Sequence, residues 1–302
     1  DNYVLQRRWK ATDNCGNTAT ALQILTVQDT TRPVLALVPA DATVSCDAIP
    51  AAGSPIASDN CTIVADLSYD GEFRVDGSCP DTYTLFRRWT AADKCGNVSK
   101  AEQKLTVQDT VAPQFTFVPA GVTVSCENVP AVETPQATDN CDAGVTVTFD
   151  GEIRLDGTCP DKYTLKRRWT AADNCGNSVS AEQIIEVEDN ARPEFTFVPV
   201  DATVNCEAIP GLGAPAATDN CDTSVEIIFE GETYTGGDCA SGGVMVRRWV
   251  AKDNCGNTAA VEQMLTVQDT TKPEFTYLPA NLTVSCENIP SLDAPAATDN
   301  CT

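Results

Sequence analysis

The stretch Arg-Arg-Trp-Thr-Ala-Ala-Asp-Asn-Cys-Gly-Asn at residues 167–177 contains the features that decide the fold of this 302-residue chain. A segment with a strand-like pattern runs into a turn built from Asp, Asn, Cys and Gly. The Arg-Arg-Trp triplet recurs at residues 7–9, 87–89 and 247–249, so that all successive copies are equally spaced. A fixed period is typical of tandem modules that contact only their neighbours along the chain.

The fifteen cysteines follow the same period, without insertion or deletion. They fall into four classes, each with the spacing of the triplet: Cys15, Cys95, Cys175 and Cys255; Cys46, Cys126, Cys206 and Cys286; Cys61, Cys141, Cys221 and Cys301; and Cys79, Cys159 and Cys239. So many cysteines indicate an oxidising compartment, in which disulfides persist.

We place each repeat boundary just after the aspartate of a linker-like segment, whose first copy is residues 29–33. The predicted units are residues 1–29 (the C-terminal part of a preceding repeat), 30–109, 110–189, 190–269, and 270–302 (the N-terminal part of a following repeat). Three complete repeats account for twelve cysteines. We therefore expect Cys15, Cys286 and Cys301 to bond to cysteines elsewhere in a longer parent protein.

The charge balance limits the possible partners. Lys and Arg number 20 and Asp and Glu number 43, which gives a formal net charge of −23. Binding to nucleic acid needs a basic face that displaces counterions, so we expect no nucleic-acid partner. The chain has no histidine, which removes Ser-His-Asp triads, Cys-His pairs and imidazole metal sites. No apolar run approaches the length of a membrane-spanning helix, so we expect no direct membrane insertion.

Alternation of residue types predicts an all-β fold. Tyr83, Leu85 and Trp89 fall on one face of a strand, and this face keeps its apolar residues in most copies, whereas the other face varies. We therefore expect the Leu/Trp face to be the core, and we expect turns at pairs such as Asp70-Gly71. Short strands at regular spacing predict tandem immunoglobulin-like β-sandwich repeats of about 80 residues, each with two disulfides.

Four cysteines per repeat allow three disulfide connectivities. In an immunoglobulin-like path, Cys46 and Cys79 fall at the far end of the repeat, whereas Cys61 and Cys95 fall at the linker end. We therefore expect cysteines at the same end of one repeat to pair: Cys46–Cys79, Cys61–Cys95, Cys126–Cys159, Cys141–Cys175, Cys206–Cys239 and Cys221–Cys255. Zinc binding is not favoured, because the chain has no Cys-x-x-Cys motif.

Each repeat also has two loops in which an aspartate precedes a cysteine, and an aspartate ends the strand before each linker. If these segments meet at the linker end, three carboxylates converge, and Ca²⁺ prefers such oxygen ligands. The expected interdomain calcium ligands are Asp29, Asp59 and Asp93; Asp109, Asp139 and Asp173; and Asp189, Asp219 and Asp253. The alternative is plain turn chemistry, because Asp and Asn bond to their own backbone in tight turns.

The first arginine of each Arg-Arg-Trp triplet points toward the core and needs a charged partner. The best candidate is the glutamate of a repeated Asp-Gly-Glu segment, which predicts the structural ion pairs Arg87–Glu72, Arg167–Glu152 and Arg247–Glu232. The second arginine, Arg88 in the first complete repeat, faces outward, where it pairs across the sheet or contacts another chain. Because the acidic pairs recur in every repeat without a histidine, we expect no enzymatic activity.

Residues 107–115, Val-Gln-Asp-Thr-Val-Ala-Pro-Gln-Phe, resemble the Asp-rich, Pro-x-Phe junction of cadherin-type repeats. The stretch at 167–177 is similar to the end of hyalin-type (HYR) repeats, in which an aromatic strand also runs into an Asp…Gly-Asn hairpin. The four-cysteine, 80-residue repeat as a whole resembles tandem modules in very large surface adhesins of Bacteroidota. This resemblance implies type IX secretion and association with gliding or with cell-surface fibres.

These features predict a structural and adhesive segment of a very large secreted protein at the cell surface. It would act as an extended, disulfide-stapled stalk or as a strand of an extracellular fibre, for which the resemblance suggests a grappling-hook-like appendage. Expected partners are neighbouring repeats, other copies in a homo-oligomeric fibre, and another cell surface or glycan reached through other parts of the protein. Two alternatives stay open: a ligand- or glycan-binding ectodomain, with residues 231–243 as the divergent loop, and a spacer array of a secreted enzyme.

Overall fold

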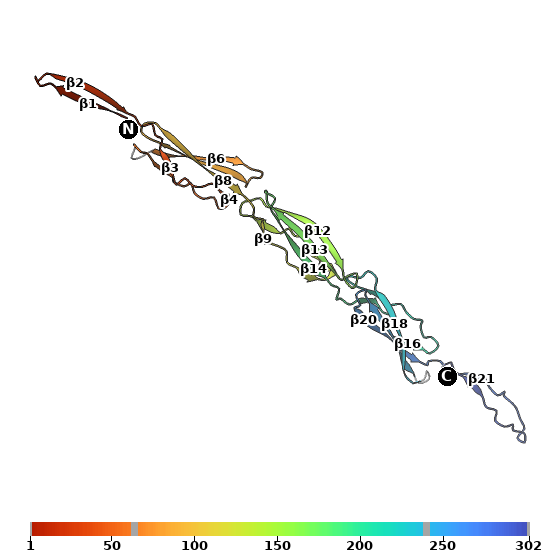
Figure 1. Cartoon of the computed structure of the whole chain (residues 1–302). Coiled ribbons are helices and arrows are strands. Elements are labelled where there is room, and N and C mark those ends of the chain that lie inside the picture. Colours follow the sequence, from red (N-terminus) through yellow and green to blue (C-terminus); the bar gives the residue numbers. More distant parts are fainter. Residues whose placement is uncertain (1, 62–65, 238–241, 301–302) are drawn as a thin grey trace. The chain divides into compact units, whose positions relative to one another are not determined.

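The computed structural model describes residues 2–61, 66–237 and 242–300 (Figure 1). Its regular structure is β-strand, apart from one short 3-10 helix at Cys126–Asn128, and the described residues include no α-helix. Within the same residues, no helix has the length and apolar character needed to cross a membrane. The predicted all-β class is confirmed.

Contacts within the chain divide it into two units, and each is described by itself. The first unit consists of Asp1–Pro119, Glu133–Gly151 and Arg168–Glu182, and the second consists of Ala120–Val132, Glu152–Arg167 and Gln183–Thr302. The division passes through the strands of the middle repeat, so the two units do not follow the 80-residue period.

The strands of the first unit begin with an antiparallel hairpin and continue through one complete repeat. They are β1 (Tyr3–Thr12), β2 (Thr18–Val27), β3 (Val34–Ala36), β4 (Ala42–Ser45), β5 (Ile56–Ser58), β6 (Asp66–Asp76), β7 (Tyr83–Ala92) and β8 (Val98–Gln108). The three long strands and the short strand β4 form a sheet in the order β4-β8-β7-β6, in which only β4 and β8 are parallel. Strands β3 and β5 form a second, two-stranded sheet, so the repeat has a sandwich-like organisation.

The second unit repeats this arrangement. Its strands are β10 (Val122–Val124), β15 (Glu194–Phe197), β16 (Ala202–Asn205), β17 (Ala216–Thr218), β18 (Glu226–Gly236), β19 (Gly243–Lys252), β20 (Thr258–Gln268), β21 (Glu274–Tyr277) and β22 (Ala296–Thr298). The order β16-β20-β19-β18 matches that of the first repeat, and β15 pairs with β17 as β3 does with β5.

The middle repeat supplies strands to both units. Its remaining strands are β9 (Gln114–Phe117), β11 (Gln136–Thr138), β12 (Thr146–Asp156), β13 (Tyr163–Ala172) and β14 (Ser178–Val187). In the first unit β9 pairs with β11, and in the second β10 runs parallel to β14. The strand order β10-β14-β13-β12 is again the same.

The core lies on the Leu/Trp face of the Arg-Arg-Trp strand, as the residue alternation predicts. Trp89 is 2% exposed, and Leu85 packs with Leu105 and Val107. The antiparallel register places Leu85 opposite Leu105, which explains why these two positions share one apolar cluster. The same cluster recurs in the second unit around Ile185.

The sequence predicts a turn at Asp70-Gly71, and this prediction is wrong, because the pair forms a β-bulge inside strand β6. The register shifts between Tyr69 and Gly71, and Gly71 has a φ of 98°, a conformation that glycine adopts without steric cost. The bulge keeps Tyr69 opposite Trp89 and places Glu72 opposite Arg87. The Asp-Gly-Glu segment therefore directs a carboxylate toward the buried arginine.

The expected ion pairs are present at this bulge in all three complete repeats. The distances from arginine Nε to the glutamate carboxylate are 3.1 Å for Arg87–Glu72, 2.7 Å for Arg167–Glu152 and 3.3 Å for Arg247–Glu232. Each arginine is almost fully buried and also donates to a backbone carbonyl, which for Arg167 is that of Pro130 at 2.8 Å. The Arg167 guanidinium is thus satisfied by one carboxylate and by backbone acceptors, whereas Nη1 of Arg87 and Nε of Arg247 are buried without a hydrogen-bond partner among the described residues.

The third complete repeat differs at one pair of positions. In the first two repeats, an arginine lies over a tyrosine ring, at 3.7 Å for Arg74–Tyr83 and 3.6 Å for Arg154–Tyr163. The equivalent residues are Tyr234 and Gly243, and a Cβ at Gly243 would collide with the Tyr234 ring. An aromatic ring is therefore retained, but the neighbouring strand supplies it.

Replacing Glu152 with Gln should lower the free energy of unfolding by about 1–3 kcal/mol, because the buried Arg167 guanidinium would lose its counter-charge. Urea unfolding followed by tryptophan fluorescence would measure this loss. The matched control is Asp156→Asn, because the Asp156 side chain is 78% exposed and pairs with Arg154 at the surface. We expect the control to change stability by less than about 0.5 kcal/mol, and equal effects of the two substitutions would contradict the structural role of Glu152.

Candidate functional site

Disulfides join each repeat to the next. The four bonds between described cysteines are Cys46–Cys141, Cys79–Cys175, Cys126–Cys221 and Cys159–Cys255. Their partners are 95 or 96 residues apart, and their Cα atoms are 5.1–5.9 Å apart, which is the usual range for disulfides. Two covalent bonds therefore close each of the junctions near Asp109 and Asp189.

The predicted pairing within repeats is wrong for the described cysteines. Cys46 does not bond to Cys79, and Cys61 does not bond to Cys95. The equivalent predictions Cys126–Cys159, Cys141–Cys175 and Cys221–Cys255 fail in the same way. Cys206 is disulfide-bonded, but its expected partner Cys239 lies outside the described residues.

The physical reason is a choice between two neighbours at the same junction. The immunoglobulin-like path assigned Cys46 and Cys79 to the far end of one repeat, and it assigned the classes of Cys141 and Cys175 to the linker end. The bonds fit this assignment. The far end of one repeat meets the linker end of the next. A far-end cysteine therefore lies beside a linker-end cysteine of the next repeat, and it bonds to that cysteine instead of to the other far-end cysteine of its own repeat.

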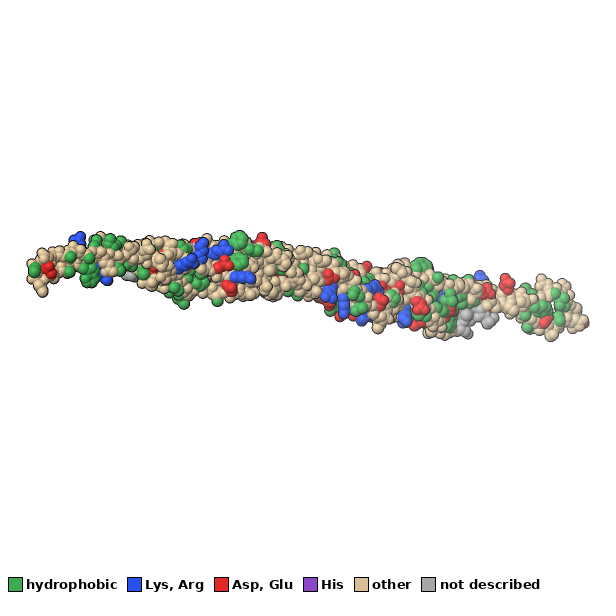
Figure 2. Space-filling model, turned by 45° about the horizontal axis from the view of Figure 1, so that its top comes forward, with side chains coloured by type: hydrophobic (Ala, Val, Ile, Leu, Met, Phe, Trp, Pro, Cys, Tyr) green, Lys and Arg blue, Asp and Glu red, His purple; other side chains and the backbone are tan. Residues whose placement is uncertain are grey.

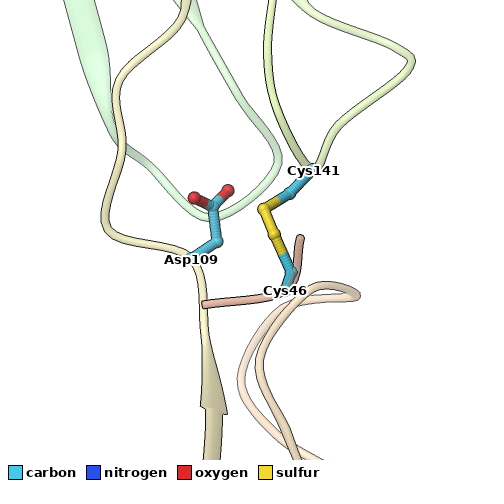
Figure 3. Close-up of side chains that lie close together, drawn as sticks. All are labelled: Cys46, Asp109 and Cys141. Atoms are coloured by element: carbon cyan, nitrogen blue, oxygen red, sulfur yellow. A yellow bond between two sulfur atoms is a disulfide. The ribbon is translucent and has the colours of Figure 1, made fainter. Parts of the chain in front are cut away.

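The carboxylates of Asp109, Asp139 and Asp173 meet at the same junction, as the sequence predicts. One carboxylate oxygen from each residue lies within 4.8 Å of the others. Asp109 follows strand β8, Asp139 precedes Cys141 in the loop after β11, and Asp173 begins the hairpin turn after β13. Figure 3 shows the Asp109 carboxylate beside the Cys46–Cys141 disulfide.

Turn chemistry holds one part of each carboxylate. Oδ1 of Asp173 accepts hydrogen bonds from the backbone N–H groups of Cys175 and Asn177, at 2.8 and 2.9 Å. Oδ1 of Asp139 accepts from the N–H of Cys141 at 2.8 Å, and Oδ1 of Asp109 accepts from the N–H of Val111 at 3.2 Å. These are the Asx turns that the alternative interpretation expects.

In two of these carboxylates, the second oxygen takes no part in a turn. Within the described residues, Oδ2 of Asp109 and Oδ2 of Asp139 are buried and have no hydrogen-bond partner. Asp109 as a whole is only 6% exposed. A buried carboxylate oxygen without a donor carries a large desolvation cost, so this arrangement favours a cation over an empty space.

The electrostatics of the junction divide the aspartates into two kinds. Burial raises the pKa of Asp109, and the nearby charges of Asp139, Asp173 and Asp81 raise that pKa further, although the bond from Val111 opposes them. Burial also acts to raise the pKa of Asp173, but the hydrogen bonds from Asn177 and the turn backbone outweigh it and hold the pKa below its ordinary value. The charged state is therefore more costly for Asp109 than for Asp173.

Equivalent groups occur at the other junctions. Carboxylate oxygens of Asp29, Asp59 and Asp93 lie within 4.8 Å of one another. In the second unit, Asp189 and Asp219 form such a group together with the sulfur of Cys221. Burial raises the pKa of Asp189, with further contributions from Asp219, Asp253 and Asp161, so Asp253 belongs to the same cluster of charges. Within the described residues, Oδ2 of Asp189, Asp219 and Asp253 is buried without a hydrogen-bond partner.

Three further residues at this junction were not predicted from the sequence: Asn174, Asp81 and Asp142. The Asn174 side chain donates to Asp81 of the preceding repeat at 2.8 Å, and the Asn174 backbone N–H donates to Asp142 at 2.9 Å. The second unit has the same contacts, from Asn254 to Asp161 and Asp222. The 80-residue spacing of Asp81 and Asp161 was available as a signal, but only the structure shows that this loop reaches the next repeat.

The outward arginines pair across the sheet. Arg88 Nε lies 2.7 Å from Glu102, and Arg248 lies 2.7 Å from Glu230 and 3.1 Å from Glu262. Figure 2 shows acidic and basic side chains interspersed on the visible face. These exposed pairs occupy the outward arginines without a second chain, and each contributes little to stability.

Peptide mapping of the unreduced chain should recover Cys126 linked to Cys221 and Cys159 linked to Cys255, because these cysteines meet at one junction. Proteolysis at acidic pH would limit disulfide exchange before mass spectrometry. Recovery of Cys126 linked to Cys159 would restore the pairing within repeats and contradict the junction described here.

Replacing Asp109 with Asn should raise the melting temperature in calcium-free buffer at neutral pH, by roughly 2–4 °C. The pKa of Asp109 is raised, so the folded chain binds a proton more readily than the unfolded chain, and stability falls as the pH rises from the ordinary value of 3.8 through the raised value. Asn removes that loss. The matched control, Asp76→Asn, removes a side chain that is 80% exposed. A lower melting temperature for the Asp109 variant alone would mean that the carboxylate stabilises the metal-free junction.

No protein-family model matches the chain, and no curated protein matches it. Solved structures with similarity include the extracellular domain of protocadherin GammaB4 (15% identity, TM-score 0.33, covering 89% of this chain and 56% of that one). Drosophila N-cadherin EC1-4 gives 16% identity and a TM-score of 0.29, over 88% of this chain and 84% of that one. The human desmocollin-1 ectodomain gives 12% identity and a TM-score of 0.27, over 89% and 69%. The chain spans just over half of the protocadherin structure, and superpositions at this level do not assign it to a family.

Proposed function

We propose that this chain is a segment of an extracellular stalk or fibre, built from tandem β-sandwich repeats whose junctions are closed by disulfides and by Ca²⁺. The observation that carries this proposal is the construction of the junction. Two disulfides bond one repeat to the next, and a buried cluster of carboxylates lies beside them. A segment that only displayed a ligand-binding loop would not need the junctions near Asp109 and Asp189 to be closed in this way.

The disulfides support a location outside the cell or at its surface. Four such bonds among described residues, with more cysteines at the same spacing, persist only where the surroundings are oxidising. The formal net charge of −23 favours an array that is soluble and extended, because like charges along the chain repel one another.

Calcium fits the oxygen atoms at the junction. Two oxygen ligands bound to one Ca²⁺ at about 2.4 Å can lie at most about 4.8 Å apart, and one carboxylate oxygen from each of Asp109, Asp139 and Asp173 meets that limit. The ion would use the buried Oδ2 atoms that have no donor, and it would offset the burial and the charge repulsion that together raise the pKa of Asp109. Asp189, Asp219 and Asp253 would serve the next junction, and Asp29, Asp59 and Asp93 the preceding one.

The repeat boundaries at 30–109, 110–189 and 190–269 belong to the same proposal. Each boundary then follows a junction aspartate, so that one repeat supplies Asp109 and the next supplies Asp139 and Asp173. Homo-oligomeric fibre formation, type IX secretion and the relation to hyalin-type repeats stay predictions from the sequence.

The test is a calcium titration of the oxidised chain by calorimetry, with small-angle scattering in calcium and in chelator. We expect saturable binding between micromolar and millimolar calcium. The variant Asp109→Asn/Asp189→Asn should bind two fewer ions, whereas the matched control Asp76→Asn/Asp156→Asn should bind as many as the unmodified chain. Absence of calcium uptake at millimolar concentration would refute the calcium site. A scattering profile of a collapsed, flexible chain in both conditions would refute the stalk.

A further inference from the structure

The disulfides fall into two series that run along the chain. The first series contains Cys46–Cys141 and Cys126–Cys221, and the second contains Cys79–Cys175 and Cys159–Cys255. Within each series, the first cysteine of the second bond lies about 15 residues before the second cysteine of the first bond. The backbone that links two successive bonds is therefore short, from Cys126 to Cys141 in the first series and from Cys159 to Cys175 in the second.

We propose that each series forms a continuous covalent track through the repeats, and that the two tracks carry tension along the array even when a repeat has lost its fold. A tensile load can pass through Cys46–Cys141, through the backbone from Cys141 back to Cys126, and through Cys126–Cys221. It then bypasses most of the 80-residue period. The second track follows the same logic through the backbone from Cys159 to Cys175.

The tracks set a limit on extension. A fully stretched repeat of about 80 residues without disulfides would span roughly 270–290 Å. The linking backbone of a track, roughly 15 residues per repeat, spans only about 50–58 Å, to which a disulfide adds a Cα–Cα step of 5.1–5.9 Å. An unfolded repeat inside an oxidised array can therefore reach only about one fifth of its free length.

This limit on extension depends on which cysteines are bonded to each other, not on the number of disulfides. Two bonds within each repeat would leave a shortest path of about 46 residues per repeat, because Cys46–Cys79 and Cys61–Cys95 would interleave and only one of them could shorten the path. Bonds between repeats leave a path about one third as long, because each of them spans more than one full period.

The buried arginines tie the two tracks together. Arg167 lies between Cys159 and Cys175, in the second track, and donates to the carbonyls of Pro130 and Ala131, which lie between Cys126 and Cys141 in the first. Arg247 makes the equivalent bonds to Pro210 and Gly211. The first arginine of the Arg-Arg-Trp triplet thus couples the two load paths while the repeat is folded.

The mechanical role rests on the proposed function, but the tracks rest only on the disulfide connectivity. The test is therefore made in chelator, so that failure of the calcium site leaves it unaffected. The 302-residue chain, with Cys206→Ser to remove the further disulfide of Cys206, is held through cysteine-free tags at its two ends. Force–extension curves are then recorded to full extension, before and after reduction.

Reduction should lengthen the fully stretched chain about 2.7-fold. In a chain of this length, the shortest path uses one bond of each track: it runs to Cys46, from Cys141 forward to Cys159, and from Cys255 to the end, about 110 residues out of 302, whereas either track alone leaves about 142. Pairing within repeats would give only about 1.5-fold, and that result would overturn the proposal.

Two matched variants separate a continuous track from the mere presence of two disulfides. Cys46→Ser/Cys126→Ser removes the first track and leaves the second whole, so reduction should lengthen the chain about 2.1-fold. Cys46→Ser/Cys159→Ser also leaves two disulfides, Cys79–Cys175 from one track and Cys126–Cys221 from the other, but only one of these interleaved bonds can shorten the path, and the expected factor falls to about 1.5. Equal factors for the two variants would refute the tracks.

Discussion

The bonding of far-end cysteines in one repeat to linker-end cysteines in the next is the constraint on which the rest of this structure depends. Cys46–Cys141 and Cys79–Cys175 close loops of 95 and 96 residues, each worth roughly 4–5 kcal/mol by chain entropy, although the two overlap and do not add. The bonds hold loops of two repeats against each other. They thereby hold several carboxylates within a few ångströms of one another, although the like charges of these groups repel.

The small core explains why the junctions matter. Each complete repeat buries one tryptophan and a few aliphatic side chains, and many large apolar residues remain exposed on the sheets. A buried arginine, satisfied by a glutamate and by backbone carbonyls, occupies space that a larger domain would fill with hydrocarbon. Repeats of this size gain from covalent staples, and here the staples lie between repeats, so that each repeat is stabilised together with its neighbours.

The two interpretations of the Asp-Asn-Cys loops describe different atoms of the same side chains. Oδ1 of Asp109, Asp139 and Asp173 shapes a tight turn in each case. Oδ2 of Asp109 and of Asp139 is buried without a donor among the described residues. Turn formation orients each carboxylate and, within the described part of the chain, leaves the second oxygen of Asp109 and Asp139 without a donor, whereas Oδ2 of Asp173 accepts from the Asn177 side chain at 2.8 Å. One sequence motif can therefore serve the local fold and a cation at once.

The sequence by itself determined the period, the all-β class, the core face and the three aspartates that meet near Asp109, but not Asp81 and Asn174 at the same junction. Period-two alternation fixes which face of a strand is buried, and the fixed spacing carries every assignment from one repeat to the next. The sequence also predicts that Glu72 pairs with Arg87, although it predicts a turn where the structure has the bulge that directs Glu72. Only the tertiary structure decided which cysteines bond. Cys46 has candidate partners in its own repeat and in the next, both at the same spacing from copy to copy, and periodic information cannot distinguish them. The choice depends on which loops face each other across the junction, and that is a property of the packed chain.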